Sequence, residues 1–218
     1  MTPNQAYYDD NYLSLVPEDL RAPILDLGCG QGDFSRYLTE RGYKSVTAAD
    51  RDEAAMQKLV ELPGITAKTV ALSPSNIPRR RGGWALIVAK QMIYYFDRRE
   101  APALVKSLRD ALAPDGRLIV EIFNGSLMSG RFTELKDPGI LTAYTENGLR
   151  RLLEQSGLVV ESMTGGRVRH RGFPGFLYAA AQALWFRLYR LILIIERGHD
   201  DELPRISSKS IIAVARKG

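Results

Sequence analysis

The sequence predicts an α/β fold with a doubly wound, mostly parallel sheet, and three observations support this prediction. Apolar runs of strand length alternate with segments of helical pattern along the 218 residues. The run ILDLGCGQGDF at 24–34 is an apolar strand that breaks into alternating glycines and then opens a helix. An acid, Asp50, ends the next apolar run about 20 residues beyond these glycines, as in sheets that bind nucleoside cofactors.

The remaining elements follow from local patterns along the chain. Apolar runs bounded by glycine, proline or polar residues predict seven strands, at 23–27, 45–50, 65–72, 84–89, 117–123, 158–163 and 210–215. Helices are expected at 31–41, 53–61, 99–112, 146–156 and 173–197. The length suits a single domain over 1–218, with an N-terminal cap segment at 1–20 and a helical insertion or lid at 166–204.

The glycine spacing favours a sulfonium cofactor over a dinucleotide. A dinucleotide fingerprint needs G-x-G-x-x-G and places a pyrophosphate on the helix N-terminus. Here the glycines fall at 28, 30 and 32, Asp33 follows them, and Asp26 precedes them. These carboxylates would repel phosphates, whereas S-adenosylmethionine carries a sulfonium and an ammonium and no phosphate. The loop therefore predicts S-adenosylmethionine, with Gly28, Cys29 and Gly30 in backbone contact.

Asp50 is the predicted ligand of the cofactor's ribose. A carboxylate at the end of the second strand can accept hydrogen bonds from both ribose hydroxyls. The alternative is that Asp50 only caps the helix that begins near Glu53. Because Asp50 follows the glycine loop at the expected distance, the ribose interpretation is favoured.

These motifs resemble the class I S-adenosylmethionine-dependent methyltransferases, in the group of small methyltransferase domains. The resemblance rests on 24–35, 46–50, 84–96 and 111–123, and it extends through 144–158. In particular, ALAPDGRLIV at 111–120 resembles the family's L-x-P-G-G turn before strand five. The resemblance covers roughly 7–163 and 207–217, and it implies a Rossmann-like sheet of seven strands with an antiparallel last strand.

The resemblance also implies site residues. Tyr12, in an aromatic and acidic N-terminal segment, is expected to reach the methionine carboxylate, unless that segment is a helix docked by its aromatic side chains. The family usually places an acid after strand three to meet the adenine amino group, but this chain has Leu72 and Ser73 there. The cofactor-binding residues expected in all are Asp26, Gly28, Cys29, Gly30, Asp50, Arg51, Leu72, Ser73, Lys90, Gln91 and Tyr12.

The catalytic candidates are fewer. Many relatives have a histidine where this chain has Tyr95, whose unperturbed pKa near 10 makes it a poor base and a better pocket-lining residue. His170 has the best side chain for a general base, because histidine titrates near neutrality. The alternative for His170 is a surface residue in a basic loop.

Composition excludes several classes of function. The net charge of +5 is mild and no nucleic-acid-binding module accompanies it, so no nucleic-acid partner is expected. One cysteine, Cys29, permits no internal disulfide, and the two histidines lack metal-ligand spacing, so no metal is expected. The N-terminus lacks the pattern of a secretory signal, which predicts a cytoplasmic protein.

The segment 173–197 is an unusually apolar helix with a narrow polar stripe. Gln182, Arg190 and Arg197 recur at helical spacing, and Arg187 lies beside them. A transmembrane span is disfavoured by the central arginines. The helix could lie in the inner membrane surface as a peripheral contact, or lie on the domain as a lid or homodimer surface with its apolar side buried.

These observations predict an enzyme that methylates a small-molecule or glycan-linked acceptor, with oxygen as the favoured nucleophile. One alternative is a lipid or quinone methyltransferase at the membrane surface, whose acceptor would contact the apolar helix. The other is a non-catalytic S-adenosylmethionine-binding protein that uses the helix to hold a partner. The insertion at 166–204 is expected to form part of the acceptor pocket, because it connects strands at the edge where the methyl group would point.

Overall fold

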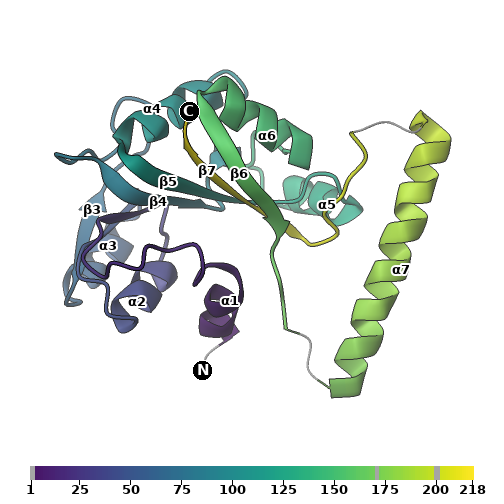
Figure 1. The fold of residues 1–218 in the computed structure, drawn as a ribbon, viewed down its shortest axis with the longest axis horizontal. Coiled ribbons are helices and arrows are strands. Elements are labelled where there is room, and N and C mark those ends of the chain that lie inside the picture. Colours follow the sequence, from purple (N-terminus) through teal and green to yellow (C-terminus); the bar gives the residue numbers. More distant parts are fainter. Residues whose placement is uncertain (1–2, 170–171, 199–201) are drawn as a thin grey trace.

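The computed structural model describes residues 3–169, 172–198 and 202–218, and they form one sheet with helices on both faces (Figure 1). The sheet has seven strands in the order β3-β2-β1-β4-β5-β7-β6. All neighbouring strands from β3 to β5 are parallel, and β7 is antiparallel to both of its neighbours. The predicted fold class is therefore confirmed. The strands are β1 (Ile24–Leu27), β2 (Val46–Asp50), β3 (Ile65–Thr69), β4 (Trp84–Lys90), β5 (Leu112–Phe123), β6 (Leu158–Gly165) and β7 (Ser210–Lys217).

The helices divide between the two faces of the sheet. The described helices are α1 (Pro3–Asn11), α2 (Asp33–Glu40), α3 (Glu53–Val60), α4 (Ala101–Ala111), α5 (Met128–Lys136), α6 (Glu146–Gln155) and α7 (Gly172–Arg197), with a short 3₁₀ turn, η1, at Ile93–Tyr95. Helices α1 to α3 lie on one face, and α4 and α6 on the other (Figure 1).

Alternation along the strands builds a core on each face. In β4, Ile87 and Ala89 pack toward α4 and α6, whereas Leu86 and Val88 pack toward α1 and α2. The same alternation continues in β5, so that Glu121 falls on the α1 face near the carboxyl end of the strand. Two-sided burial explains why β1 and β4 are almost continuously apolar in the sequence.

Two elements differ from the sequence prediction. Strand β5 begins at Leu112 rather than at 117, because the expected Pro-Asp-Gly turn is a bulge inside the strand. Trp84 pairs with Leu112 and Leu86 with Arg117, which leaves the residues between 112 and 117 looped out of register. Helix α5 was not predicted. Its large apolar side chains, such as Phe132 and Leu135, are exposed, so it lacks the buried stripe that reveals a helix in a sequence.

Helix α7 confirms the predicted helical insertion between β6 and β7, but it does not pack as a lid. It stands beside the body of the domain, with a gap between most of its length and the sheet (Figure 1). None of its residues is buried, so the alternative of a lid whose apolar side the domain covers is wrong, whereas the membrane contact and the homodimer surface stay predictions. The Tyr189 hydroxyl of α7 donates a hydrogen bond of 2.7 Å to the carbonyl of Ser126 on the body.

Candidate functional site

The site lies at the carboxyl ends of three neighbouring strands. Strand β1 pairs in parallel with β2 on one side and β4 on the other, so the chain leaves β1 at the point where the strand order reverses. Ligands of open α/β sheets bind at such a point, because the loops there diverge to opposite faces and leave a crevice. The glycine loop after β1 forms the floor of this crevice.

The three glycines of the loop serve different purposes. Gly28 and Gly32 both have positive φ, of 67° and 77°, and a Cβ on either would lie 2.8 Å from Met92 or 2.5 Å from Leu59. They are needed for the turn and for packing. A Cβ on Gly30 would meet no heavy atom within 4 Å. Gly30 therefore leaves open space beside its backbone, which is the cradle that a cofactor requires.

Asp50, at the end of β2, is held in a fixed orientation. One carboxylate oxygen accepts a hydrogen bond of 2.8 Å from the backbone N–H of Gly30, and the other accepts one of 3.0 Å from the N–H of Asp52. The capping role belongs instead to Asp52, which accepts from the N–H of Ala55 at the start of α3. Asp50 is therefore free of the capping task and is preorganised toward the loop.

Asp26 supplies a second, buried carboxylate below the loop. It is only 2% exposed, and the Ser35 hydroxyl donates a hydrogen bond of 2.6 Å to it. Burial raises the pKa of Asp26 to about 6, and the Ser35 hydrogen bond and the nearby Lys90 ammonium oppose that rise. The group is thus mostly ionised at neutral pH and can attract a cationic ligand.

Two cavities meet at Gly28. The larger, of about 410 Å³, is lined by Gly28, Gly30, Asp50, Arg51, Leu72, Gln91, Met92, Tyr95, Phe96 and Glu100. The smaller, of about 100 Å³, is lined by Tyr8, Asp26, Gly28, Cys29, Gln31, Asp33, Phe34 and Lys90. The larger cavity has the size and the apolar walls for a nucleoside. The smaller has the acids and the cation that would suit the charged end of an amino acid.

Nine of the eleven expected cofactor residues line these cavities, and Ser73 and Tyr12 do not. The Ser73 hydroxyl instead donates a hydrogen bond of 2.9 Å to Asn76, which closes the turn after β3. Tyr12 is fully buried and its hydroxyl donates to Glu121. Tyr8, one helical turn earlier on the same face of α1, lines the smaller cavity in its place, with the Lys90 ammonium 5.7 Å from its ring centre.

Sequence reasoning missed Glu121, which anchors α1. This buried carboxylate accepts hydrogen bonds from the hydroxyls of Tyr7, at 2.6 Å, and of Tyr12. The carboxylate and burial raise the pKa of both phenols, so both remain donors. The signal was present in the sequence as an acid inside an apolar strand and as tyrosines at helical spacing in the N-terminal segment.

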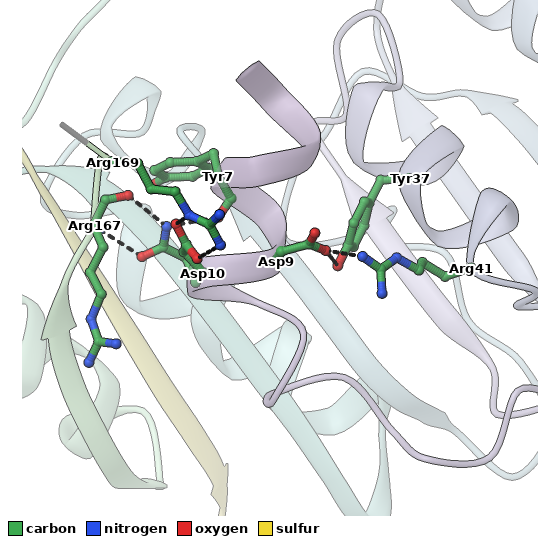
Figure 2. Close-up of polar contacts among 8 residues, drawn as sticks. Tyr7, Asp9, Asp10, Tyr37, Arg41, Arg167 and Arg169 are labelled. Atoms are coloured by element: carbon green, nitrogen blue, oxygen red, sulfur yellow. Dashed lines mark hydrogen bonds and ion pairs between the residues drawn. The ribbon is translucent and has the colours of Figure 1, made fainter. Parts of the chain in front are cut away.

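Helix α1 is also tied to α2 by polar side chains (Figure 2). Asp9 accepts a hydrogen bond of 2.8 Å from the Tyr37 hydroxyl and forms an ion pair with Arg41. Asn4 donates to the Asp33 carboxylate at 3.0 Å. The N-terminal segment is therefore both a helix docked by its aromatic side chains and a wall of the smaller cavity.

On its other side, α1 holds the chain that leads from β6 to α7 (Figure 2). Asp10 forms a two-pronged ion pair with Arg169, at 2.6 and 2.5 Å. The Asn11 side chain donates to the carbonyl of Arg167 at 2.9 Å and accepts from its N–H at 2.7 Å. These contacts fix where the lead into α7 begins.

Of the two candidate catalytic residues, the structure describes Tyr95. Tyr95 lies in η1, is 40% exposed, and donates a hydrogen bond of 2.9 Å to Asp137. Partial burial and the Asp137 carboxylate raise its pKa, so at neutral pH it can donate a hydrogen bond and cannot accept a proton. His170 lies outside the described residues, and so does His199.

Two further residues of the site, Cys29 and Gln91, have unusual environments. Burial and the carboxylates of Asp26 and Asp50 raise the pKa of the Cys29 thiol, which keeps it protonated and unreactive. Gln91 has a φ of 54°, a strained left-handed conformation for a residue with a side chain. Its N–H donates a hydrogen bond of 2.7 Å to the carbonyl of Glu121, which holds the strained turn against the larger cavity.

Within the described residues, no cluster of three or more metal-ligating side chains is present. The fold and the site together define a class, the α/β proteins that hold a nucleoside cofactor over a glycine loop and an acid on β2. Residues 4–163 match a family described as "Methyltransferase domain". The chain therefore belongs to this family of methyltransferase domains.

A solved structure shares the fold of this chain. An S-adenosylmethionine-dependent methyltransferase from Mesorhizobium loti superimposes with a TM-score of 0.66, covering 99% of this chain and all of that one, at 18% identity. At that identity the likeness concerns the fold alone.

The curated relatives are longer proteins, and the chain spans half or less of each one described below. Sphingolipid C9-methyltransferase 2 of Gibberella zeae is 25% identical over 190 residues, which span 82% of this chain and 36% of that protein. A shikimate dehydrogenase (NADP(+)) of Bacillus cereus is 26% identical over 145 residues, 65% of this chain and half of that protein. The second match reflects the sheet and loop that both cofactor classes use. Asp33, in the first turn of α2 and on the wall of the smaller cavity, disfavours the phosphates of a dinucleotide here.

Proposed function

We propose that the chain transfers the methyl group of S-adenosylmethionine to an oxygen atom of a small-molecule or glycan-linked acceptor. The position of Tyr95 carries this proposal. Its phenol lines the same cavity as Asp50 and Gly30 and remains 40% exposed, so an acceptor entering from solvent would meet it. A protonated phenol suits an acceptor oxygen, which can accept its hydrogen bond.

The chain's main task in this reaction is positioning. When bound, S-adenosylmethionine supplies a methyl carbon that the acceptor oxygen attacks in line with the departing sulfur. Asp50 would hold the ribose, and Asp26 with Tyr8 would hold the charged amino-acid end. Holding the reacting atoms at contact distance can lower the barrier by about 7–11 kcal/mol. Tyr95 would exchange its hydrogen bond to Asp137 for one to the acceptor.

The acceptor hydroxyl must also lose its proton as the new bond forms. His170 is the proposed base, because an imidazole with a pKa near 6.5 can take that proton at neutral pH. Replacing His170 with Asn should lower the rate by about 10²-fold or more and remove the acidic limb of the pH–rate profile. His199→Asn serves as the matched control. An unchanged pH profile in the His170 variant would exclude this role.

A lipid or quinone acceptor at the membrane surface is the second candidate. It is favoured by the exposed apolar surface of α7 and by the similarity to a protein named as a sphingolipid methyltransferase. The chain spans only 36% of that relative, so the acceptor of the relative is a guide to chemical class and no more.

A labelling experiment tests both candidates. The purified chain is incubated with tritiated S-adenosylmethionine and cell extract, and the products are divided into aqueous and organic-soluble fractions. We expect label in an acceptor with the natural chain and little with Asp50→Ala. Cofactor binding without transfer to either fraction would contradict an enzymatic role and favour a non-catalytic binding protein.

A further inference from the structure

The N-terminal half of α7 is an apolar helix that almost nothing covers. From Gly172 to Phe186 the helix contains no charged residue. Phe173 is 72% exposed, Phe176 68% and Trp185 54%, and this half of the helix stands away from the sheet (Figure 1). The helix is long and apolar enough to cross a membrane by length and composition, with a mean hydropathy of 1.3 in its best window, none of it buried. Water is a poor environment for this surface.

The distribution of these side chains around the helix shows what kind of partner fits. Phe173, Leu177 and Leu184 lie on one side, because they are separated by about one or three helical turns. Tyr178 and Trp185 lie about a third of a turn away, and Phe176 projects from the other flank. The one polar side chain, Gln182, donates to the Tyr178 hydroxyl within the helix.

A second copy of the chain would cover only one stripe of such a helix. Helix pairs bury a narrow seam and leave a polar opposite face, whereas a helix that is apolar all round needs an apolar medium around it. A lipid bilayer is such a medium, and α7 satisfies its own backbone groups by its helical hydrogen bonds. The exposed faces of α7 therefore fit lipid better than a protein partner.

The length of its uncharged segment and the arginines beside that segment determine how deeply α7 can insert into a bilayer. The uncharged segment has fifteen residues, about 22 Å of helix, which is shorter than the hydrocarbon core of about 30 Å. Arg187 follows it directly, and Arg167 precedes the helix on the lead from β6, where Arg169 is already paired with Asp10. Both ends of α7 return to the same sheet, at β6 and at β7. This arrangement suits insertion into one leaflet, with guanidinium groups at the level of anionic headgroups.

The C-terminal half of α7 contacts the domain and thereby places the helix relative to the cofactor cavities. Its half-buried residues, Tyr189, Arg190, Leu193 and Ile194, turn toward the domain, as does Phe186 at the end of the uncharged segment. Tyr189 bonds to Ser126, just beyond the carboxyl end of β5. A cavity of about 200 Å³ lies between α7 and the start of α5, lined on the helix side by Gln182, Trp185, Phe186 and Tyr189, so α7 approaches the domain from about Gln182 onward. Helix α7 therefore lies at the carboxyl edge of the sheet, the edge on which the cofactor cavities open.

We infer that the N-terminal half of α7 inserts into one leaflet of an anionic membrane and that the acceptor is carried by a lipid in that leaflet. The second part of this inference rests on the proposed methyl transfer, and it selects the second of the two candidate acceptors, a hydroxyl on a lipid or lipid-linked molecule. The first part stands on α7 alone.

Vesicle flotation of the full chain tests the insertion. We expect the natural chain to float with phosphatidylcholine–phosphatidylglycerol vesicles, and to float less with phosphatidylcholine alone or at high salt. Phe176→Glu with Trp185→Glu should stay with the soluble fraction. Leu20→Glu with Val60→Glu is the matched control, since both sites are exposed apolar residues away from α7, and it should float. Circular dichroism melting confirms that each variant is folded.

Tryptophan emission gives an independent measurement of depth. The chain has two tryptophans, and Trp84 is 3% exposed and hydrogen-bonded to the carbonyl of Pro78, so Trp185 dominates any change. Vesicles should shift the emission to the blue, and brominated acyl chains should quench it. A chain that ignores vesicles and forms a dimer that the α7 variant abolishes would overturn the insertion and assign α7 to a second copy.

The acceptor is tested separately with the same variants. The natural chain should label a lipid fraction presented in vesicles, and the α7 variant should lose most of that labelling while it still binds S-adenosylhomocysteine. Labelling confined to water-soluble acceptors, with vesicle binding intact, would overturn the lipid acceptor and leave both the insertion and the methyl transfer standing. Loss of cofactor binding in the natural chain would instead contradict the proposed function.

Discussion

At the scale of single residues, two carboxylates at the ends of neighbouring strands define the site. Asp50 is oriented by backbone N–H groups of Gly30 and Asp52, and Asp26 is buried against Ser35. Both positions follow directly from the sequence, because each acid ends an apolar strand beside the glycine loop. Because their environments differ, we propose that Asp50 binds the ribose and that Asp26 binds the charged end of the cofactor.

Removing the Asp50 carboxylate should weaken cofactor binding strongly. We expect Asp50→Ala to lose about 1.5–3 kcal/mol of binding free energy, because charge-assisted hydrogen bonds to a diol disappear. Calorimetric titration with S-adenosylhomocysteine measures this loss. Asp52→Ala is the control, since Asp52 caps α3 and should affect stability more than affinity. Equal affinities in the natural chain and in Asp50→Ala would rule out the ribose assignment.

Asp26 should make cofactor affinity depend on pH. Its pKa in the fold, about 6, lies above the unfolded value, so the apo protein loses stability as pH rises from about 4 through 6. A cationic cofactor prefers the ionised carboxylate, so its affinity for the site should rise with pH. Below the pKa of Asp26, that affinity should fall about tenfold for each pH unit. Titrations between pH 5 and pH 8, about the range over which this group ionises, should show this fall in the natural chain and not in Asp26→Asn. The same slope in both proteins would contradict the assignment.

At the scale of elements, α1 joins three parts of the molecule. It packs Tyr8 against α2, bonds to Glu121 on β5 through Tyr7, and holds the chain that leads to α7 through Asp10 and Asn11. Most of these links are between residues far apart in the sequence, so no local pattern could reveal them. The helix itself therefore closes the smaller cavity through tertiary contacts rather than through its own propensity.

The bond between Tyr12 and Glu121 should be important for stability. Tyr12→Phe removes one donor from a buried carboxylate, and we expect a loss of about 1.5–3 kcal/mol in the free energy of unfolding. Urea denaturation with an unchanged slope would establish this value. Tyr37→Phe, whose hydroxyl bonds to Asp9 nearer the surface, should cost less. If the two variants were equally stable, Glu121 would not be the anchor of α1.

Features that depend on neighbouring residues in the sequence could be predicted, whereas features that depend on contacts between distant segments could not. The strand ends, the glycine loop and nine residues expected at the cofactor could be placed at the two cavities, because most of them follow one another along β1, β2 and β4. Tyr12 and Ser73 could not, since their partners, Glu121 and Asn76, decide which way they point. The bulge in β5 depends on pairing with β4, and α5 has no buried stripe.

At the scale of the whole molecule, the described chain has a polar catalytic edge and an apolar helix beside it. The seven-stranded sheet and its two cores account for the body of the domain, and α7 lies outside them (Figure 1). We expect the glycine loop after β1 to bind a sulfonium nucleoside rather than a dinucleotide. The match to an NADP(+)-dependent dehydrogenase makes this choice testable, since the two cofactors compete for one loop.

The most direct test compares the two ligands by calorimetry on the purified chain. S-adenosylhomocysteine should bind at one site per chain, and Asp50→Ala should weaken that binding. NADP(+) should give no saturable heat, because the Asp26 and Asp33 carboxylates line the smaller cavity beside the glycine loop and would repel a pyrophosphate there. Saturable binding of NADP(+) together with no binding of S-adenosylhomocysteine would contradict the account.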